Sequence, residues 1–381
     1  MCGHSCKESC HAGVDCKPCC RPCPVKCAHS MCPNVCNSIC APCIERCEWM
    51  CEHEGRCFEP CGAPCTRKLC DRRCAKLLPC GHHCPSVCGE PCPNPDVACK
   101  LCARPNAQRH VVDLILFQTL EDYSVEENGP LIALACGHVY SMESLDGLMQ
   151  LANHYELDAN LKWGAPKQMT GQLNKMISCP DCRAPITGVF RYGRAINKSL
   201  LDMMTCKFRV AGERKLSALR KQLFEVQHTE SAEEKYSRKL LRHIETNLRD
   251  ILNTKHPLQK IYEAARSKAS RASAQLLSIP PLDQSIHATS RLLLIEVRVK
   301  YFEMAKSKLL TTSSRSNDRN PSAAAVPTDK WKQIIREFTI DKELRSLITF
   351  MTQQQMLSSA REALCVAGKY PQTSAAMSAL P

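Results

Sequence analysis

The chain has 381 residues, of which 30 are cysteine, and carries 51 Lys and Arg against 38 Asp and Glu. Twenty-five of the cysteines fall within residues 2–102 with few large apolar residues between them, so burial alone cannot hold this segment together. No apolar signal-peptide core follows Met1, and no run of about 18 apolar residues occurs. These features favour a reduced, intracellular protein of the nucleus or cytoplasm with no membrane span, and metal rather than disulfides as its cross-link.

A Cys-x-His tripeptide occurs four times near the start of the chain. The copies begin at Cys2, Cys27, Cys51 and Cys80, with further cysteines at x2 and x3 spacing after each. A disulfide framework needs no histidine at a fixed offset, whereas thiolate and imidazole are the ligands that zinc prefers. Four ligands per ion give roughly seven structural Zn²⁺ over the array. The spacing does not decide which ligands share an ion.

The predicted zinc ligands of this array share the cysteine or histidine chemistry and the phase of the repeat. They are Cys2, His4, Cys6, Cys10, His11, Cys16, Cys19, Cys23, Cys27, His29, Cys32, Cys36, Cys40, Cys43, Cys47, Cys51, His53, Cys57, Cys61, Cys65, Cys70, Cys74, Cys80, His82, Cys84, Cys88, Cys92, Cys99 and Cys102. We expect their ligand sets to be filled, which leaves no open position for a catalytic water.

Two stretches of the array resemble NF-X-type zinc fingers. Residues 2–19 read Cys-Gly-His-Ser-Cys-x3-Cys-His-x-Gly-x2-Cys-x2-Cys, and residues 80–92 read Cys-Gly-His-His-Cys-x3-Cys-Gly-Glu-Pro-Cys. The middle copies depart from the pattern, for example in the Ser-Met that separates His29 from Cys32. The resemblance implies zinc-stabilised units with little regular secondary structure over residues 1–105.

A globular composition begins after residue 102. Residues 111–117 have the apolar content of a strand, although a helix is possible for so short a run. Residues 121–130 are acidic and end in a turn, and residues 131–135 predict a buried strand. Residues 144–154 predict an amphipathic helix, and residues 158–172 a polar loop.

This segment contains a Cys-Gly-His-x-aromatic motif, followed by the predicted helix and by Cys-Pro-x-Cys-x2-Pro-Ile. The combination resembles the second half of a RING domain, and Cys136, His138, Cys179 and Cys182 match one of its two zinc sites. The other site would need cysteine where this chain has Ser141 and Ser144. The resemblance therefore implies a degenerate, single-zinc α+β domain over residues 106–205. The alternative is that these ligands are ordinary core residues.

The order of fingers, half-RING and the segment Arg-Tyr-Gly-Arg-Ala-Ile-Asn at residues 191–197 resembles the region after the fingers in NF-X-type zinc finger RNA helicases. No Gly-x4-Gly-Lys-Ser/Thr motif occurs, so this chain has no P-loop and is expected not to be an enzyme as it stands. The resemblance implies a role in RNA silencing, in heterochromatin-linked RNA-directed RNA polymerase complexes or in antiviral RNA sensing. It also implies protein partners in RNA-processing or silencing complexes.

The rest of the chain carries its whole positive surplus, with 30 Lys and Arg against 17 Asp and Glu from residue 206 onward. Apolar residues at helical spacing predict a basic helical region over 206–310, broken at His256-Pro257 and at Pro280-Pro281. A flexible linker over 311–329 and a coiled-coil-like helix over 330–365 follow. A basic triplet, Arg266, Lys268 and Arg271, is the best phosphate-binding candidate, although solvated faces of packed helices are the favoured explanation of the charges in this tail.

The expected fold is thus an array of about four zinc fingers, a half-RING and a helical tail. Zinc-bound thiols are deprotonated, so the loaded fingers should be net acidic and poor RNA binders by themselves. The expected function is a non-catalytic zinc-binding scaffold for protein partners. The alternatives are a RING-like ubiquitin ligase and a direct RNA-binding module that uses the tail.

Overall fold

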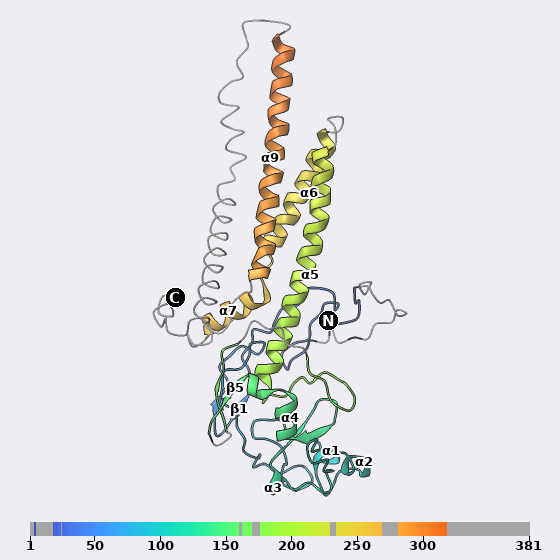
Figure 1. Cartoon of the computed structure of the whole chain (residues 1–381), viewed down its shortest axis with the longest axis vertical. Helices are drawn as coiled ribbons and strands as arrows, with labels where there is room; N and C mark the ends of the chain where they lie inside the picture. Colours follow the sequence, from blue (N-terminus) through green and yellow to red (C-terminus); the bar gives the residue numbers. More distant parts are fainter. Residues whose placement is uncertain are drawn as a thin grey trace, which may run out of the picture. The chain divides into compact units, whose positions relative to one another are not determined.

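The computed structural model describes residue 4 and residues 18–23, 25–159, 162–169, 176–228, 234–268 and 281–317. Predicted ligands Cys2, Cys6, Cys10, His11 and Cys16 lie outside these residues, as do the predicted helix over 330–365 and most of the linker. Two compact units form, one from Met1–Phe208 and His256–Ile279, the other from Arg209–Lys255 and Pro280–Pro381. Figure 1 shows their elements in sequence colours.

The cysteine-rich part of the first unit is built from short hairpins rather than from long strands. Antiparallel pairs Lys26 with Met31, Met50 with Arg56 and Leu77 with His83 each enclose one Cys-x-His tripeptide. The middle pair belongs to strands β1 (Met50–Cys51) and β2 (Gly55–Arg56). A second pair closes each hairpin further out: Pro22 with Val35, Arg46 with Pro60 and Arg73 with Val87. Repetition of the sequence therefore appears as repetition of one local fold.

Short helices α1 (Pro95–Ala98), α2 (Pro105–Gln108) and α3 (Val125–Asn128) lead into a small α+β region. There β3 (Leu131–Ala133) pairs antiparallel with β4 (Val139–Ser141), and helix α4 (Met142–Leu148) and 3-10 helix η1 (Leu151–Asn153) follow. The predicted strand over 131–135 is thereby confirmed. The predicted helix over 144–154 is shorter than expected, because Gln150 adopts a left-handed conformation with φ 49°.

The predicted polar loop over 158–172 is partly an antiparallel hairpin of β5 (Tyr155–Leu157) and β6 (Trp163–Pro166). Its first strand faces the core, where Ile132, Tyr140, Leu145 and Tyr155 are fully buried. This core also contains Cys179, one of the predicted zinc ligands.

Residues 111–117 form a turn, so the prediction of a strand there is wrong. The Asp113 carboxylate accepts from the backbone N–H groups of Ile115 (2.7 Å) and Leu116 (3.1 Å), and Phe117 has φ 56°. An Asp that bonds the backbone two and three residues ahead reverses the chain and competes with strand formation. Ile115, Leu116 and Phe117 consequently lie exposed, whereas Val112 before them is buried.

The helices of the tail follow the predicted breaks. Helix α5 (Gly193–His228) precedes α6 (Glu234–Asn253), α7 begins at the predicted proline (Pro257–Lys268), and α9 (Pro281–Asn317) begins at the second of the two adjacent prolines. Helix α9 continues into the first residues of the predicted linker. In the second unit α6 packs on α9, with Leu241, Ile244 and Leu248 fully buried. Among the described helices, none is long and apolar enough to cross a membrane.

Candidate metal centres

Four clusters each bring three cysteine sulfurs and one histidine together, with all ligand atoms within 4.8 Å of one another. They are Cys27, His29, Cys43 and Cys61; Cys51, His53, Cys70 and Cys88; Cys80, His82, Cys99 and Cys102; and Cys136, His138, Cys179 and Cys182. A fifth cluster contains His4, Cys19 and Cys36. These are the ligand types of structural zinc sites.

The spacing of the ligand atoms fits tetrahedral zinc. Bonds of about 2.3 Å to sulfur and about 2.0 Å to nitrogen place neighbouring ligands about 3.8 Å (S to S) and about 3.5 Å (S to N) apart. His53 Nδ1 lies 3.6 Å from Cys51 Sγ and 3.7 Å from Cys70 Sγ. His138 Nδ1 lies 3.4 Å from Cys136 Sγ and 3.6 Å from Cys179 Sγ. The residues present therefore fit the ion, and in each case Nδ1 is the nitrogen offered.

Three further clusters contain cysteine alone. Sulfurs of Cys23 and Cys40 lie 3.3 Å apart, and Cys32 lies 3.9 Å from Cys40. Cys47 contacts Cys57 and Cys65, and Cys74 and Cys84 gather around Cys92 in the same way. These sulfurs offer the same thiolate ligands as the four clusters above.

Most of these clusters join two consecutive repeats. Cys61 of the third repeat completes the cluster of Cys27 and His29, and Cys88 of the fourth completes that of Cys51 and His53. The three-cysteine clusters likewise take their first sulfur from one repeat and the other two from the next. Two clusters therefore cross-link each pair of neighbouring repeats, so loss of one ligand should loosen two repeats rather than one.

Carboxylates lie near the Nε2 atoms of two of the histidines. His29 Nε2 lies 3.3 Å from Glu48 Oε1, and His138 Nε2 lies 3.9 Å from Asp181 Oδ2, which also accepts from the Tyr140 hydroxyl at 2.8 Å. With Nδ1 toward the sulfurs, the proton belongs on Nε2, where Glu48 is close enough to accept it from His29, whereas Asp181 lies beyond hydrogen-bond distance of His138 and acts only through its charge. Such outer partners fix the tautomer and orientation of a ligating imidazole.

The thiols of one cluster perturb each other strongly when no metal balances them. Donation from Cys57 and Cys65 lowers the pKa of Cys47 to about 3, and the same contact raises the pKa of Cys57 to about 11. The first thiolate is therefore easy to form and the second difficult. A divalent cation removes that conflict by replacing the shared protons.

Ser141 and Ser144, at the start of α4, form a hydrogen-bond network with Asp113. The Ser141 hydroxyl donates to Ser144 Oγ at 2.8 Å, Ser144 donates to Asp113 Oδ1 at 3.3 Å, and the Leu114 N–H donates to Ser144 Oγ at 2.9 Å. All three polar side chains are buried. This hydrogen-bond network ties the turn at Asp113 and Leu114 to the start of α4.

The segment at residues 191–197 holds the finger array against the α+β region. Arg191, whose side chain is 2% exposed, donates to both oxygens of Asp146 (2.8 and 2.7 Å), to the Cys70 carbonyl (2.8 Å) and to Asp71 (2.8 Å). Although burial opposes it, hydrogen bonding to Asp146 raises the pKa of Arg191. Arg194 donates to the Cys65 carbonyl at 2.9 Å.

Further along the same segment, Asn197 donates to the carbonyls of Cys61 (2.9 Å) and Ala63 (2.7 Å). At Gly193 an added Cβ would lie 2.9 Å from Cys65 Sγ, so only glycine fits against that ligand. From the finger side, the Glu90 carboxylate accepts the N–H groups of Phe190 (3.1 Å) and Arg191, and burial raises the pKa of Glu90. These contacts, called here the clamp at residues 191–197, give a structural role to a motif that the sequence analysis left without one.

Two basic residues near the sulfurs had no sequence signal. Lys207 of α5 donates to Cys23 Sγ (3.3 Å) and Cys40 Sγ (3.2 Å). The Arg67 guanidinium stacks 3.9 Å from the centre of the Trp49 ring and contacts the Phe190 carbonyl. Lone basic residues at irregular spacing carry no pattern, so only the fold brings them to the thiolates.

Known proteins match part of this chain. It is 31% identical over 149 residues to the "NFX1-type zinc finger-containing protein 1 homolog" of Caenorhabditis elegans, and 33% and 27% identical over 154 residues to "NFX1-type zinc finger-containing protein 1" of Homo sapiens and Mus musculus. The matches cover 39–40% of this chain but only 5–6% of those proteins. No protein-family model and no solved structure matches. Together with the cysteine and histidine clusters, this similarity supports NF-X-type zinc fingers and structural zinc in this chain.

Proposed function

We propose that this chain is a non-catalytic, zinc-stabilised scaffold that binds protein partners in RNA-related assemblies. The observation that carries the proposal is the cross-linking of neighbouring repeats by shared clusters, together with the clamp at residues 191–197. Cross-linked repeats form a surface that stays fixed without a large apolar core. Fixed surfaces bind partners with little loss of conformational entropy.

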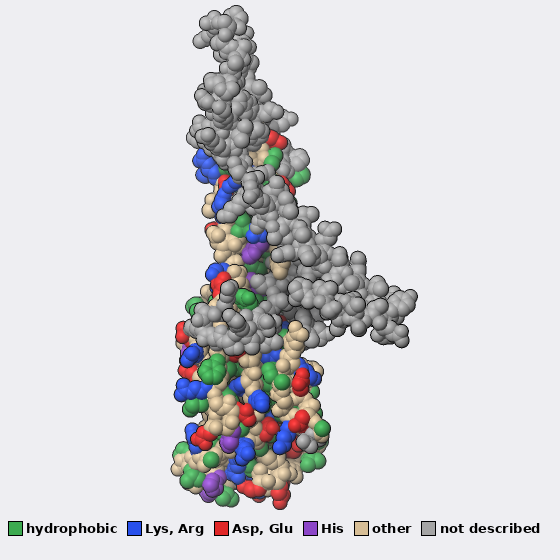
Figure 2. Space-filling model, turned by 90° about the vertical axis from the view of Figure 1, so that its left-hand side faces the viewer, with side chains coloured by type: hydrophobic (Ala, Val, Ile, Leu, Met, Phe, Trp, Pro, Cys, Tyr) green, Lys and Arg blue, Asp and Glu red, His purple; other side chains and the backbone are tan. Residues whose placement is uncertain are grey.

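The RNA-related setting rests on the resemblance to NF-X-type zinc finger RNA helicases. Charge supports a protein partner over RNA on the one face that Figure 2 shows. On the face shown in Figure 2, basic and acidic side chains are interspersed rather than gathered by sign. A nucleic-acid-binding face more commonly carries a continuous basic patch.

The test is a pulldown with the full chain as bait, with and without RNase. Partners that bind directly should survive RNase and should be lost when Cys61→Ser opens a cluster shared by two repeats. Cys206→Ser is the matched control, because this cysteine of α5 lies outside the clusters. Loss of every partner on RNase treatment would refute the scaffold proposal and favour RNA binding.

A second candidate function, a RING-like ubiquitin ligase, is favoured by the turn at residues 111–117. Ile115, Leu116 and Phe117 are 59%, 65% and 76% exposed, although the turn that carries them is held by Asp113 and Ser144. An ordered turn with three exposed apolar side chains is a feature of interaction sites. The missing second zinc therefore weighs less against this function than the sequence alone suggests.

An assay for the second candidate combines the purified chain with ubiquitin, activating enzyme and common conjugating enzymes. Ligase activity should produce ubiquitin chains that disappear when Leu116→Ser and Phe117→Ser are combined. No conjugates with any conjugating enzyme would leave the scaffold as the better account.

A further inference from the structure

We infer that Lys207 of α5 is the counter-charge of the zinc-bound thiolates of Cys23 and Cys40, and that it strengthens the hold of their cluster on its metal without being a ligand. The inference goes beyond the scaffold proposal. It requires only that the array binds zinc, so it can stand while partner binding fails, and the reverse.

The first argument is the geometry of the ammonium group. Lys207 Nζ donates to Cys23 Sγ at 3.3 Å and to Cys40 Sγ at 3.2 Å, and the two sulfurs lie 3.3 Å apart. One cation therefore bridges two sulfurs of the same cluster. A protonated lysine has three hydrogen-bond donors and no lone pair, so it bonds to thiolates but does not bind a metal ion.

The second argument is the place of Lys207 on its helix. Leu201, Met204 and Lys207 follow one another at intervals of three residues, which puts them on one face of α5. Leu201 and Met204 are buried in the same apolar cluster as Cys23 and Cys40. The helix thus presents two apolar side chains and one cation to the same pair of sulfurs.

The third argument is the exclusion of water. Cys23 and Cys40 are only 3% and 1% exposed, and Leu258 and Ile261 of α7 belong to the apolar cluster around them. Attraction between opposite charges is severalfold stronger in such surroundings than in water. Deprotonated, zinc-bound thiols give the ammonium a charge to pair with, whereas neutral thiols would leave it uncompensated.

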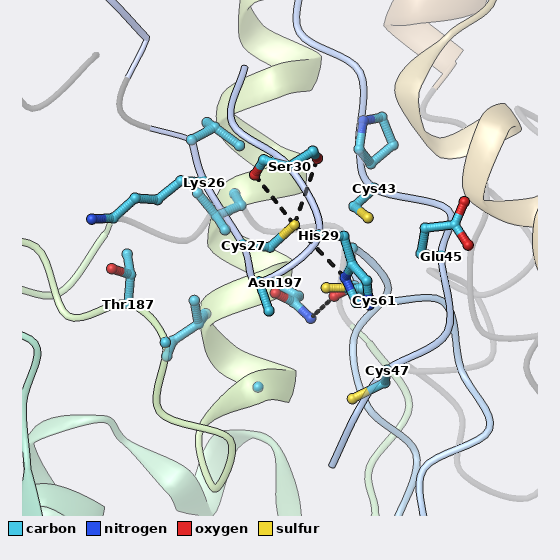
Figure 3. A pocket seen from close by; sticks show the side chains of 18 of the residues that line it. Lys26, Cys27, His29, Ser30, Cys43, Glu45, Cys47, Cys61, Thr187 and Asn197 are labelled. Carbon is cyan, nitrogen blue, oxygen red and sulfur yellow. Dashed lines mark hydrogen bonds between the residues drawn. The ribbon is translucent and has the colours of Figure 1, made fainter. Parts of the chain in front are cut away.

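A neighbouring cluster differs in its contacts with the same helix. Figure 3 shows Cys27 and Cys61 of that cluster, which lie at the wall of a cavity of about 790 Å³. Cys27 Sγ contacts the hydroxyl and the carbonyl of Ser30 at 3.7 and 3.5 Å, and both groups are neutral. Asn197 of α5 bonds to the Cys61 carbonyl rather than to a sulfur. An effect of Lys207 is therefore expected at its own cluster and not at this one.

The experiment follows zinc loss from the full chain by native mass spectrometry during titration with a chelator. Lys207→Met removes the charge but keeps a long, unbranched side chain, so one ion should leave at a roughly tenfold lower chelator concentration. Lys207→Arg keeps the charge and should stay within about threefold of wild type. Lys215→Met is the matched control, because it removes a positive charge from an exposed position of the same helix.

Alkylation locates the ion that leaves. Once the first ion has left Lys207→Met, iodoacetamide should label Cys23 and Cys40 but not Cys27, as peptide mapping will show. Loss of this ion from Lys207→Met before any chelator is added, with retention in Lys207→Arg, would also support the inference. Equal chelator sensitivity of Lys207→Met and wild type, or equal loss from Lys207→Met and Lys207→Arg, would overturn it.

Cobalt distinguishes a charge effect from a packing effect or from ligation. In the Co²⁺-loaded chain, thiolate-to-metal charge-transfer absorption reports the electron density on sulfur, and d–d absorption reports the number and kind of ligands. Lys207→Met should move charge-transfer absorption equivalent to one centre to longer wavelength and leave the d–d absorption as in wild type. Unchanged charge-transfer absorption would point to packing alone, and altered d–d absorption would make Lys207 a ligand; either result overturns the inference.

Discussion

Replacing Arg191 by Met should detach the finger array from the α+β region. Arg191 makes two hydrogen bonds to Asp146 and one each to Asp71 and the Cys70 carbonyl, all at 2.7–2.8 Å. Asp146 is 9% exposed, so the substitution leaves its carboxylate buried without a counter-ion. Removing one partner of such a buried pair costs about 3–5 kcal/mol. By contrast, Asp71→Ala removes a partner that is 40% exposed and should cost less than about 1 kcal/mol.

Hydrogen–deuterium exchange of the zinc-loaded chain measures this cost locally, which suits a protein with more than one unit. A loss of about 3–5 kcal/mol corresponds to roughly 150- to 5,000-fold faster exchange, against about fivefold for Asp71→Ala. Peptides around residues 61–72 and 186–200 should lose protection together in Arg191→Met. The reasoning is refuted if the two variants behave alike, or if only one of the two peptides responds. Arg191→Met combined with Asp146→Leu should recover part of the loss, because it removes both charges.

Removal of zinc from the full chain under reducing conditions should unfold residues 1–105 but leave the helical circular dichroism of the tail, since the tail is held by helix packing such as that of α6 on α9 rather than by metal; retained finger structure in excess chelator would contradict the zinc assignment. Cys179→Ser should melt residues 131–200 and lose one zinc by native mass spectrometry. Ser144→Ala should keep that zinc yet lower the free energy of unfolding of this region by about 1–3 kcal/mol, because it breaks a buried hydrogen-bond network. Changing the basic triplet to alanine should weaken RNA binding equally for all sequences, with a steep salt dependence in filter binding; salt-resistant binding by the fingers would reverse this assignment. Burial, Arg194 and Lys198 lower the pKa of His154 to about 4. An unfolded histidine titrates near 6.5, so the unfolded chain binds the proton first and stability falls as the pH drops from about 6.5 to 4. In urea titrations His154→Leu should lose this component, and an unchanged pH slope would exclude it.

The zinc chemistry could be predicted from the sequence because it depends on cysteine and histidine ligands that lie close together along the chain. Cys-x-His places sulfur and imidazole within one tight hairpin, whatever surrounds it, and the hairpins around Cys27, Cys51 and Cys80 confirm this. Breaks at proline are equally local, and α7 begins at Pro257 as expected. The buried strand at 131–135 followed from its unbroken apolar run.

Predictions from local sequence were wrong where a side chain changed the direction of the backbone. Residues 111–117 are apolar enough for a strand, but Asp113 turns the chain and leaves Phe117 exposed. Serine at 141 and 144 indicated a lost metal site, and only the structure shows that these hydroxyls and Asp113 bond to each other instead. The sequence identified the missing ligands but contained no signal for their replacement.

The tertiary structure alone decided which ligands share an ion and how the repeats are joined. Cys61 lies 34 residues after Cys27 in the chain yet completes its cluster, and nothing in the spacing distinguishes it from Cys57 or Cys65. The cysteine sulfurs of the array are chemically equivalent, so they can be assigned to zinc ions in many ways that all agree with the spacing of the ligands in the sequence. The choice depends on how hairpins stack and on where residues 191–197 anchor them, through contacts such as Asn197 to the Cys61 carbonyl. Ligand type is a property of the residue, whereas ligand pairing is a property of the packed chain.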